Sequence, residues 1–360
     1  MSARLLAVSG LGAKEPAAFV VETGQRRLLL DCGEGPEPGH LPDFNAIGRV
    51  DAVLLSHGHA DHAGALRLRE RIGNPPIHAT MPVLARLKDV TGRAIPIGGR
   101  AEIAGVTIET GVNGHAPGGV WLRLAVGEGL LYMGDCSTES RLYAFDVPPP
   151  TATVIIDGSY GDAEEMIEPQ RARIAGIVER GPVLLPAPPD GRGPDMAMFL
   201  QEAGFDVAID DQVRSVATTL TQSARKSARP EAIAHLERLI EGARRLDGES
   251  PSQGAMVAHG GSGDVGVASA LIKRWEDQPE VTILFTGHVA AGTTGRRLVD
   301  SGRALFQRWN VHPRLSDNLG LIETVNPQRV IPAFGDSKHV AVWRSHVAPR
   351  EVIASTPITL

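Results

Sequence analysis

Four side chains that can bind a metal ion occur within six residues of the sequence. They are His57, His59, Asp61 and His62, in the run Ser-His-Gly-His-Ala-Asp-His. Imidazole nitrogen and carboxylate oxygen suit a divalent ion such as zinc. Ionisable groups packed this closely repel one another and lose hydration, so they need a partner that offsets both costs. The spacing therefore predicts a metal site.

A short strand must position this group. The apolar run Val53–Leu55 precedes it and is predicted to be a buried strand. Two further apolar runs also end in an acid, Asp135 after residues 130–133 and Asp157 after residues 153–156. We expect these strand ends to lie close together.

One more histidine occurs in a glycine-rich loop. His115 lies in residues 112–119, between strands expected at 101–110 and 120–126. A side chain on such a loop can reach a site that several strands share. On its own this histidine would be a weak candidate.

The pattern His-x-His-x-Asp-His resembles the dinuclear-metal signature of the metallo-β-lactamase fold. The resemblance implies an α/β protein, a four-layer αββα sandwich. It implies that Asp31 orients the metal loop without binding the ion, although Asp-x-Gly is also an ordinary turn sequence. It implies one or two zinc ions, with manganese as another choice. The implied ligands are His57, His59 and His115 for the first ion, Asp61 and His62 with or without His339 for the second, and Asp135 as a bridge.

Residues 157–162, Asp-Gly-Ser-Tyr-Gly-Asp, resemble the acidic motif of the β-CASP branch of this fold. That branch contains nucleases that process RNA and DNA. The resemblance implies that Ser159 and Tyr160 contact substrate. The family usually continues with a basic residue, whereas this chain has Ala163, so one phosphate contact or salt bridge is in question.

Residues 164–303 change to an alternation of helices and strands. Helices are predicted at 164–180, 193–204, 231–245 and 264–275, and strands at 182–187, 205–209, 255–259 and 281–286. This alternation favours a parallel sheet flanked by helices, which fits an inserted α/β β-CASP domain. The implied organisation is a metallo-β-lactamase domain in two parts, residues 1–163 and 304–360, with the insertion between them.

Two glycine-rich loops of the insertion resemble loops of the family that contact substrate. Backbone amides in such loops bind phosphate well, although glycine-rich turns without a ligand are common. The residues carried over are Gly260 and Gly261 in the first loop, and Thr293, Gly295 and Arg296 in the second. His259 and Ser262 depart from the usual residues of the first loop. The basic stretch 212–230 is either an edge for a polyanion or a solvated face.

The last fifth of the chain matches the family only in part. Val311–Asp317 resembles the motif that carries a histidine general acid, which implies that His312, held by Asp157, protonates the leaving oxygen. Asp61 completes the expected catalytic set. Residues 330–336 resemble the last motif, but Phe334 stands where the family has a histidine ligand. His339 could replace that ligand only if the loop folds back.

These features favour a metal-dependent phosphodiesterase, a nuclease that cleaves single-stranded RNA or DNA with hydroxide that the metal activates. Two alternatives stay open. One is a metallo-hydrolase of a small ester, thioester or lactone, because fold does not fix function. The other is a non-catalytic β-CASP-like subunit, which the intact histidine cluster disfavours.

Composition sets the remaining expectations. The 360 residues carry a formal net charge of -6, so no global basic field attracts nucleic acid. Two cysteines give no disulfide framework and are expected to be buried free thiols, with metal ligation by Cys136 as a minor reading. There is no signal peptide pattern and no membrane-spanning run. We expect a cytoplasmic protein with nucleic acid as its partner, and the family resemblance leaves a homodimer open.

Overall fold

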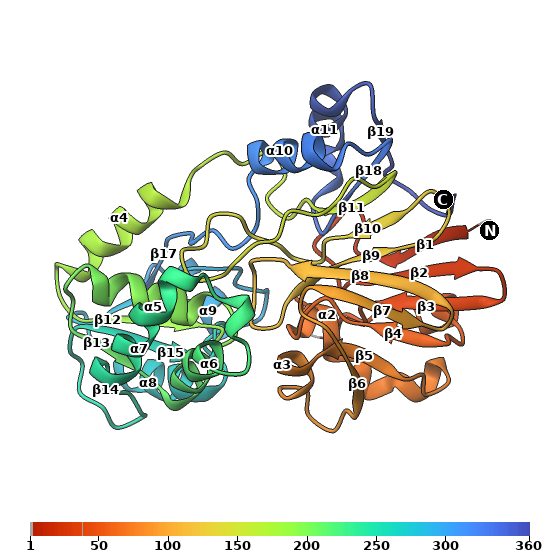
Figure 1. Ribbon diagram of the computed structural model, residues 1–360. Coiled ribbons are helices and arrows are strands. Elements are labelled where there is room, and N and C mark those ends of the chain that lie inside the picture. The colour runs from red at the N-terminus through yellow and green to blue at the C-terminus, as the bar shows by residue number, and fades with distance from the viewer. Residues whose placement is uncertain (1–2, 38) are drawn as a thin grey trace. The chain divides into compact units, whose positions relative to one another are not determined.

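The computed structural model describes residues 3–37 and 39–360. By its internal contacts the chain divides into two compact units (Figure 1). The first unit comprises Met1–Thr138, Ala144–Glu164 and His312–Leu360, and the second comprises Glu139–Tyr143 and Glu165–Val311.

The first unit contains two seven-stranded sheets. The first sheet has the order β20-β1-β2-β3-β4-β5-β6, antiparallel from β20 to β3 and parallel from β3 to β6. Its strands are β1 (Ala3–Ser9), β2 (Ala18–Thr23), β3 (Arg26–Leu30), β4 (Ala52–Leu54), β5 (Ile77–Thr80), β6 (Gly92–Ile95) and β20 (Ile358–Thr359).

The second sheet of this unit has the order β19-β18-β11-β10-β9-β8-β7. It is parallel from β19 to β10 and antiparallel from β10 to β7. Its strands are β7 (Gly99–Ile103), β8 (Val106–Val112), β9 (Val120–Leu124), β10 (Leu130–Tyr132), β11 (Thr153–Asp157), β18 (Arg329–Ala333) and β19 (Glu351–Val352).

The central strands of both sheets, such as β4, β10 and β11, are buried on both faces, to which successive side chains of a strand point in turn. In β3, Leu28 and Leu30 belong to a core that also contains residues of the second sheet, whereas Leu29 belongs to a core formed with helices. In β10, Tyr132 faces the shared core and Leu131 faces a separate core with helices. Each sheet therefore packs against the other sheet on one face and against helices on the other.

The outer layers are short helical segments. One side carries α1 (Phe44–Ile47), α2 (Ala60–Ala63), the 3-10 segment η1 (Gly64–Ile72) and α3 (Met81–Leu84); the other carries α10 (Leu315–Val325), η4 (Ser337–His339) and α11 (Val340–Val347). The expected four-layer αββα sandwich is confirmed.

The second unit is a parallel six-stranded sheet of order β14-β13-β15-β12-β16-β17. Its strands are β12 (Val183–Ala187), β13 (Val207–Ile209), β14 (Arg244–Arg245), β15 (Ala255–His259), β16 (Thr282–Phe285) and β17 (Ala304–Phe306). Its helices are α4 (Ile167–Val178), α5 (Arg192–Glu202), α6 (Asp211–Thr221), η2 (Arg225–Ser227), η3 (Pro230–Ala232), α7 (Ile233–Gly242), α8 (Gly266–Trp275) and α9 (Thr294–Asp300).

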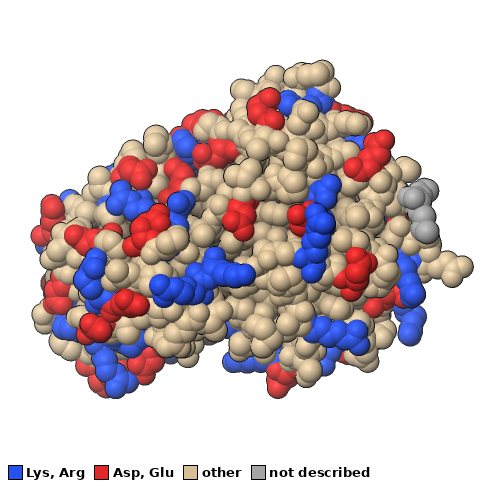
Figure 2. Space-filling view, viewed as in Figure 1, with Lys and Arg blue, Asp and Glu red and all other residues tan. Residues whose placement is uncertain are grey.

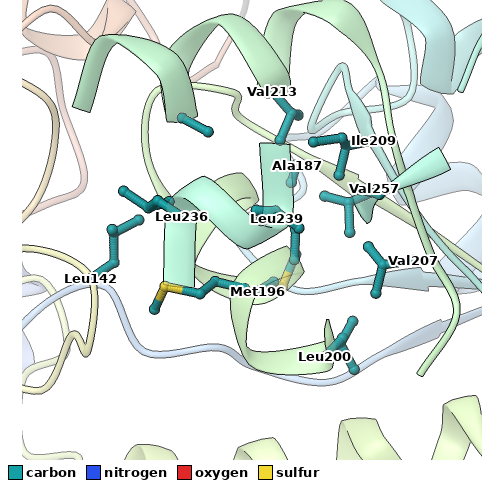
Figure 3. Packing of buried hydrophobic residues seen from close by; sticks show 14 of the residues in the cluster. Leu142, Ala187, Met196, Leu200, Val207, Ile209, Val213, Leu236, Leu239 and Val257 are labelled. Atoms are coloured by element: carbon teal, nitrogen blue, oxygen red, sulfur yellow. The ribbon is translucent and has the colours of Figure 1, made fainter. Parts of the chain in front are cut away.

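Helices cover both faces of this sheet. Leu185 of β12 packs in a core with α4 to α7, part of which is drawn in Figure 3, and Leu184 packs in a second core with α8 and α9. A sheet that is buried on both faces reads as a continuous apolar run, as β12 does. The expected parallel α/β arrangement is confirmed for this part of the chain.

The surface carries mixed charge. On the face shown in Figure 2, Lys and Arg side chains are interspersed with Asp and Glu, and no wide area of one sign stands out. In the described residues, no helix combines the length and the apolar character that crossing a bilayer requires.

Candidate metal centre and its neighbours

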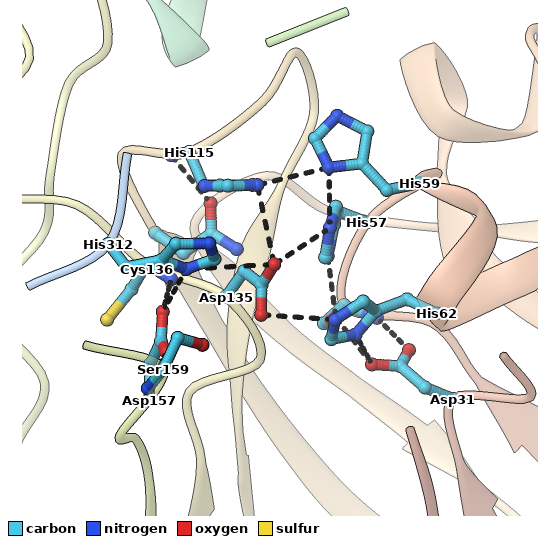
Figure 4. Close-up of polar contacts among 12 residues, drawn as sticks. Asp31, His57, His59, His62, His115, Asp135, Cys136, Asp157, Ser159 and His312 are labelled. Carbon is cyan, nitrogen blue, oxygen red and sulfur yellow. Dashed lines mark hydrogen bonds and ion pairs between the residues drawn. The ribbon is translucent and has the colours of Figure 1, made fainter. Parts of the chain in front are cut away.

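Strand ends of both sheets of the first unit supply the centre. His57 and His59 follow β4, His115 lies in the loop between β8 and β9, and Asp135 follows β10 (Figure 4). The close approach of the β10 end to the β4 end requires a glycine. A Cβ at Gly134, whose φ is 57°, would lie 2.5 Å from the Ser56 hydroxyl.

Three imidazole nitrogens converge at one point. His59 Nδ1 lies 3.1 Å from His57 Nε2 and 3.0 Å from His115 Nε2. In a tetrahedral zinc site with bonds of 2.0–2.1 Å, ligand nitrogens lie about 3.3 Å apart. Asp135 Oδ2 lies 3.9 Å from His57 Nε2 and 3.6 Å from His115 Nε2. The donor types and their spacing fit a divalent metal ion.

Asp135 also belongs to a second group of donors. Its Oδ1 lies 3.1 Å from His62 Nε2, and Asp61 lies close enough to join them. The structure therefore brings together six of the expected metal ligands in two groups that share one carboxylate. The group of four is His57, His59, His115 and Asp135, and the group of three is Asp61, His62 and Asp135.

A buried carboxylate fixes the orientation of His62. Asp31 Oδ2 lies 2.7 Å from His62 Nδ1, and the same carboxylate accepts hydrogen bonds from the Ser56 backbone N–H, the Ser56 hydroxyl and the Tyr132 hydroxyl. Asp31 is fully buried. A histidine that binds metal usually has its other nitrogen held in this way. Sequence reasoning found Asp31 but missed Tyr132, which reaches the site from an ordinary apolar strand.

Burial and mutual repulsion set the charges of these groups. The pKa of His57 is well below its usual value, because burial and the neighbouring His62, His59 and His115 all disfavour its cation. Burial raises the pKa of Asp135, because it disfavours the carboxylate anion. The surrounding histidines outweigh this effect and hold the pKa of Asp135 well below its usual value. A neutral imidazole beside an ionised carboxylate is the state that metal binding requires.

Asp157 and His312 form a hydrogen-bonded pair beside the centre. His312 Nδ1 lies 2.8 Å from Asp157 Oδ2 and 3.8 Å from Asp135 Oδ2. Burial alone would lower the pKa of His312, but these two carboxylates raise it. Asp135, Asp157 and His312 are also close enough to share an ion.

Backbone and side-chain hydrogen bonds hold Asp157 in place. Its Oδ2 accepts the Cys136 N–H at 3.0 Å and its Oδ1 accepts the Ser159 N–H at 3.1 Å. From α10, the side chain of Asn318 donates to the Asp157 carbonyl. This helix begins just after His312, with Asp317 accepting the Arg314 N–H. The start of α10 therefore supports both members of the pair.

Three further residues of the first unit were predicted from the sequence to be functional, namely Ser159, Tyr160 and His339. The Tyr160 ring packs edge-on against His312, with centroids 5.1 Å apart. The Ser159 hydroxyl is buried, and no described residue bonds to it. His339 Nδ1 lies 3.2 Å from Asp162 Oδ1, and among the described residues His339 joins neither group of donors.

Lys14 is a neighbour that sequence reasoning did not find. Burial raises the pKa of Asp61, but His62 and, more weakly, Lys14 lower it, and the lowering prevails. The same lysine opposes the increase in the pKa of His312. Its charge therefore acts both on Asp61 and on His312. A lysine in the loop between two strands gives no signal in the sequence.

The five residues expected to contact substrate from the glycine-rich loops lie in the second unit. The two loops touch each other: Gly295 N donates to Ser262 O at 2.8 Å, and Thr294 N donates to Asp264 Oδ1 at 2.9 Å. Thr293 caps α9 through Arg296 N, and the Arg296 side chain pairs with Asp300. Several hydrogen-bond donors and acceptors of the two loops are therefore already used within the second unit.

Neither cysteine is placed to bind a metal ion among the described residues. Both are free and buried. Burial, with a smaller effect of Asp31, raises the pKa of Cys32 to about 12. Burial likewise raises the pKa of Cys136 well above its usual value. Both are neutral thiols at physiological pH.

Residues 26–181 match a family model described as the β-lactamase superfamily domain. The chain is similar to a probable ribonuclease, RNase MJ4, of Methanocaldococcus jannaschii, with 24% identity over 94% of both chains. It is also similar to the transcription termination factor FttA of Methanosarcina mazei, with 24% identity over 99% of this chain and 70% of that protein.

A eukaryotic protein is similar as well. The endoribonuclease ysh1 of Schizosaccharomyces pombe is 24% identical over 93% of this chain and 54% of its own length. Among solved structures, a protein of unknown function from Enterococcus faecalis V583 aligns over the whole of both chains with a TM-score of 0.62 and 14% identity. That likeness supports the fold alone.

Proposed function

We propose that this chain, which belongs to the β-CASP branch of the metallo-β-lactamase superfamily, is a metal-dependent phosphodiesterase that cleaves single-stranded nucleic acid. The observation that carries the proposal is a four-donor metal site beside a hydrogen-bonded Asp157–His312 pair. RNA is the favoured substrate, because similar proteins are named as ribonucleases.

Zinc is the ion that we propose, with manganese as the second choice. Its ligands would be His57, His59 and His115, with Asp135 as the fourth. Three imidazoles and one carboxylate favour zinc over calcium or magnesium. A divalent ion held there supplies a nucleophile from water at neutral pH and polarises a phosphoryl oxygen.

His312 would act as the general acid. Its Nδ1 is held by Asp157, so its Nε2 is the atom that can transfer a proton to the leaving oxygen of the substrate. Asp157 fixes the tautomer and stabilises the imidazolium before the transfer. Asp61 would place its carboxylate close to the phosphoryl group on which charge develops. Tyr160 would limit the rotation of the His312 ring by packing on it.

The second unit would be the β-CASP insertion, with the first unit as the catalytic domain. The proposal follows from its parallel α/β sheet and from its place in the chain. Within it, Gly260 and Gly261 would offer backbone N–H groups to phosphates, whereas the Gly295 N–H is engaged by Ser262 O. In the first unit, Ser159 would offer its hydroxyl. We further propose a cytoplasmic homodimer, which light scattering and cell fractionation can test.

A substrate panel tests the activity. The purified protein is incubated with labelled single-stranded RNA, single-stranded DNA and bis(p-nitrophenyl) phosphate, and separately with a lactone and a thioester. We expect cleavage of RNA, and loss of that cleavage in the His57→Ala variant. Turnover of the lactone or thioester with intact nucleic acid would overturn the proposal. A metal-loaded protein inert toward every substrate would indicate a non-catalytic subunit.

A further inference from the structure

The two groups of metal donors are unequal in this chain. The first group has four donors, three imidazoles and a carboxylate, which is the number that a tetrahedral ion needs. Among the described residues the second group has only Asp61, His62 and the shared Asp135. Because Asp135 belongs to both groups, an ion at the first position would share one of the second group's three donors.

The strand order of the second sheet shows which strand end would supply a further donor to the second group. In the second sheet, the neighbouring parallel strands β10 and β11 deliver Asp135 and Asp157 at their carboxyl ends. The next strand, β18, pairs with β11 so that Ala333 lies opposite Asp157. The residue after Ala333 is Phe334. At the third strand end, the chain thus delivers a phenyl ring in place of a donor.

The Phe334 ring lies against the second group. Its centroid is 5.1 Å from that of the His62 ring, and the residue is only 4% exposed. On its other side it packs edge-on against Phe19, with centroids 6.0 Å apart. A ligand atom or a water molecule that would complete the coordination of an ion next to His62 would compete with this apolar ring for space.

The backbone keeps the ring in this position. Phe334 has a φ of 63°, in the left-handed region that side chains other than glycine seldom adopt. Its N–H donates to the Gly10 carbonyl at 2.8 Å, and a Cβ on Gly10 would lie 3.3 Å from the phenyl ring. Swinging the ring aside would expose apolar surface and break this fit.

The nearest alternative donor is engaged elsewhere. His339 Nδ1 is 3.2 Å from the carboxylate of Asp162, and its ring packs on Gly161, where a Cβ would lie 2.5 Å from the ring. His339 therefore belongs to the loop that follows β11. It is not among the donors of the second group.

From this geometry we propose that Phe334 makes the centre functionally mononuclear. One divalent ion binds tightly at His57, His59, His115 and Asp135, and the position at Asp61 and His62 holds an ion weakly. The proposal rests on the metal-dependent function above, but it concerns ion stoichiometry and affinity, which are measured without substrate.

Counting zinc tests the inference. The full chain is loaded with zinc, passed over a desalting column, and analysed by mass spectrometry for zinc per chain, with calorimetric titration of the metal-free protein. We expect about one tight ion per chain in the natural protein, and about two in Phe334→His, which adds a nitrogen donor. Histidine is among the residues that tolerate a positive φ.

Phe334→Leu is the matched control, because it changes the ring without adding a donor, and it should keep about one ion. Thermal melts show that each variant is folded. Two tight ions in the natural protein would overturn the inference, as would a folded Phe334→His that holds no more zinc than Phe334→Leu. A count of one in a protein without nuclease activity would reject the proposed function and leave this inference standing.

Discussion

The chemistry of the centre depends on which nitrogen of each histidine is committed. Asp31 engages Nδ1 of His62 and Asp157 engages Nδ1 of His312. Each histidine is left with Nε2 for the centre, because a carboxylate holds its Nδ1. Small changes to these carboxylates should therefore separate proton transfer from metal binding.

The Asp157–His312 pair provides the first prediction. His312→Ala should lower turnover by about 10² to 10⁴-fold, the usual worth of a general acid, with zinc content unchanged. Asp157→Asn keeps the size of the side chain but removes the charge that stabilises the imidazolium, so it should lose less. Single-turnover cleavage with zinc analysis measures both, and normal turnover in His312→Ala would remove the acid role.

Lys14 provides a second prediction at the same scale. Its charge acts on Asp61 and on His312, so a phosphate bound between those groups should be stabilised by it. Lys14→Met should raise KM for a nucleic acid substrate by about tenfold, equal to about 1.4 kcal/mol, without loss of zinc. The exposed Lys88 supplies the matched control, and equal effects of Lys14→Met and Lys88→Met would contradict a local role.

At the scale of elements, the strand ends that bear ligands were predictable, and so were the four helices expected in residues 164–303, which form α4, α5, α7 and α8. The run Val53–Leu55 and the acids after β10 and β11 stand out because apolar strands end abruptly in ionisable residues. The segment after the metal loop, residues 60–72, forms a short helix, α2, followed by the 3-10 segment η1, although its sequence pattern alone would suit one continuous helix. Charged residues of both signs are spread along this segment, so its sequence pattern does not show where the type of helix changes.

Part of the basic stretch is a helix, α6, that packs one face on the core of the second unit. Residues 212–230 read as an edge for a polyanion or a solvated face, but α6 buries Val213, Val216 and Leu220. Arg214 donates to carbonyls at the end of α7, so its charge is used inside the unit. A helical period of apolar residues after Asp210, a good N-cap, was the signal that could have revealed the helix.

Asp210 provides the prediction at this scale. Its Oδ1 accepts the N–H groups of Gln212 and Val213, and its Oδ2 lies 2.9 Å from His259 Nδ1. Asp210→Ala removes the cap and leaves buried donors without a partner, which should cost about 2 to 4 kcal/mol. Chemical denaturation measures the change, with the exposed Asp211→Ala as control. A loss below that of Asp211→Ala would show that the cap is unimportant.

From the sequence, Phe334 could be recognised only as a residue that stands where the family pattern has a histidine. What the sequence could not provide is the direction of the ring, which depends on a positive φ and on contact with Gly10 and Phe19. Tyr132 and Lys14 were missed for a similar reason. Their contacts join segments distant in sequence, and no local pattern reports such contacts.

At the scale of the whole molecule, charge is spread and slightly negative. The net charge of -6 and the interspersed charges of Figure 2 give little long-range attraction for a polyanion. Affinity for nucleic acid should therefore depend on a few local contacts.

This balance predicts a shallow dependence of binding on salt. For a single strand, the slope of log K against log salt is about -0.7 per phosphate neutralised, so three or four contacts give a slope of about -2 to -3. Titrations of the His57→Ala variant with labelled RNA at several salt concentrations measure it without cleavage. A slope steeper than about -5 would reveal a wide basic surface and contradict the expectation.

Residues 139–143 lie between two parts of the first unit but belong to the second. Their partners are there as well: Ser140 Oγ bonds Asp195, and Tyr143 OH donates to Gly191 O. The polypeptide consequently passes from one unit to the other four times, after residues 138, 143, 164 and 311. Cutting out 165–311 would strand Leu142 and Tyr143 in water, so neither half can be expressed as a free-standing module by trimming a single insertion.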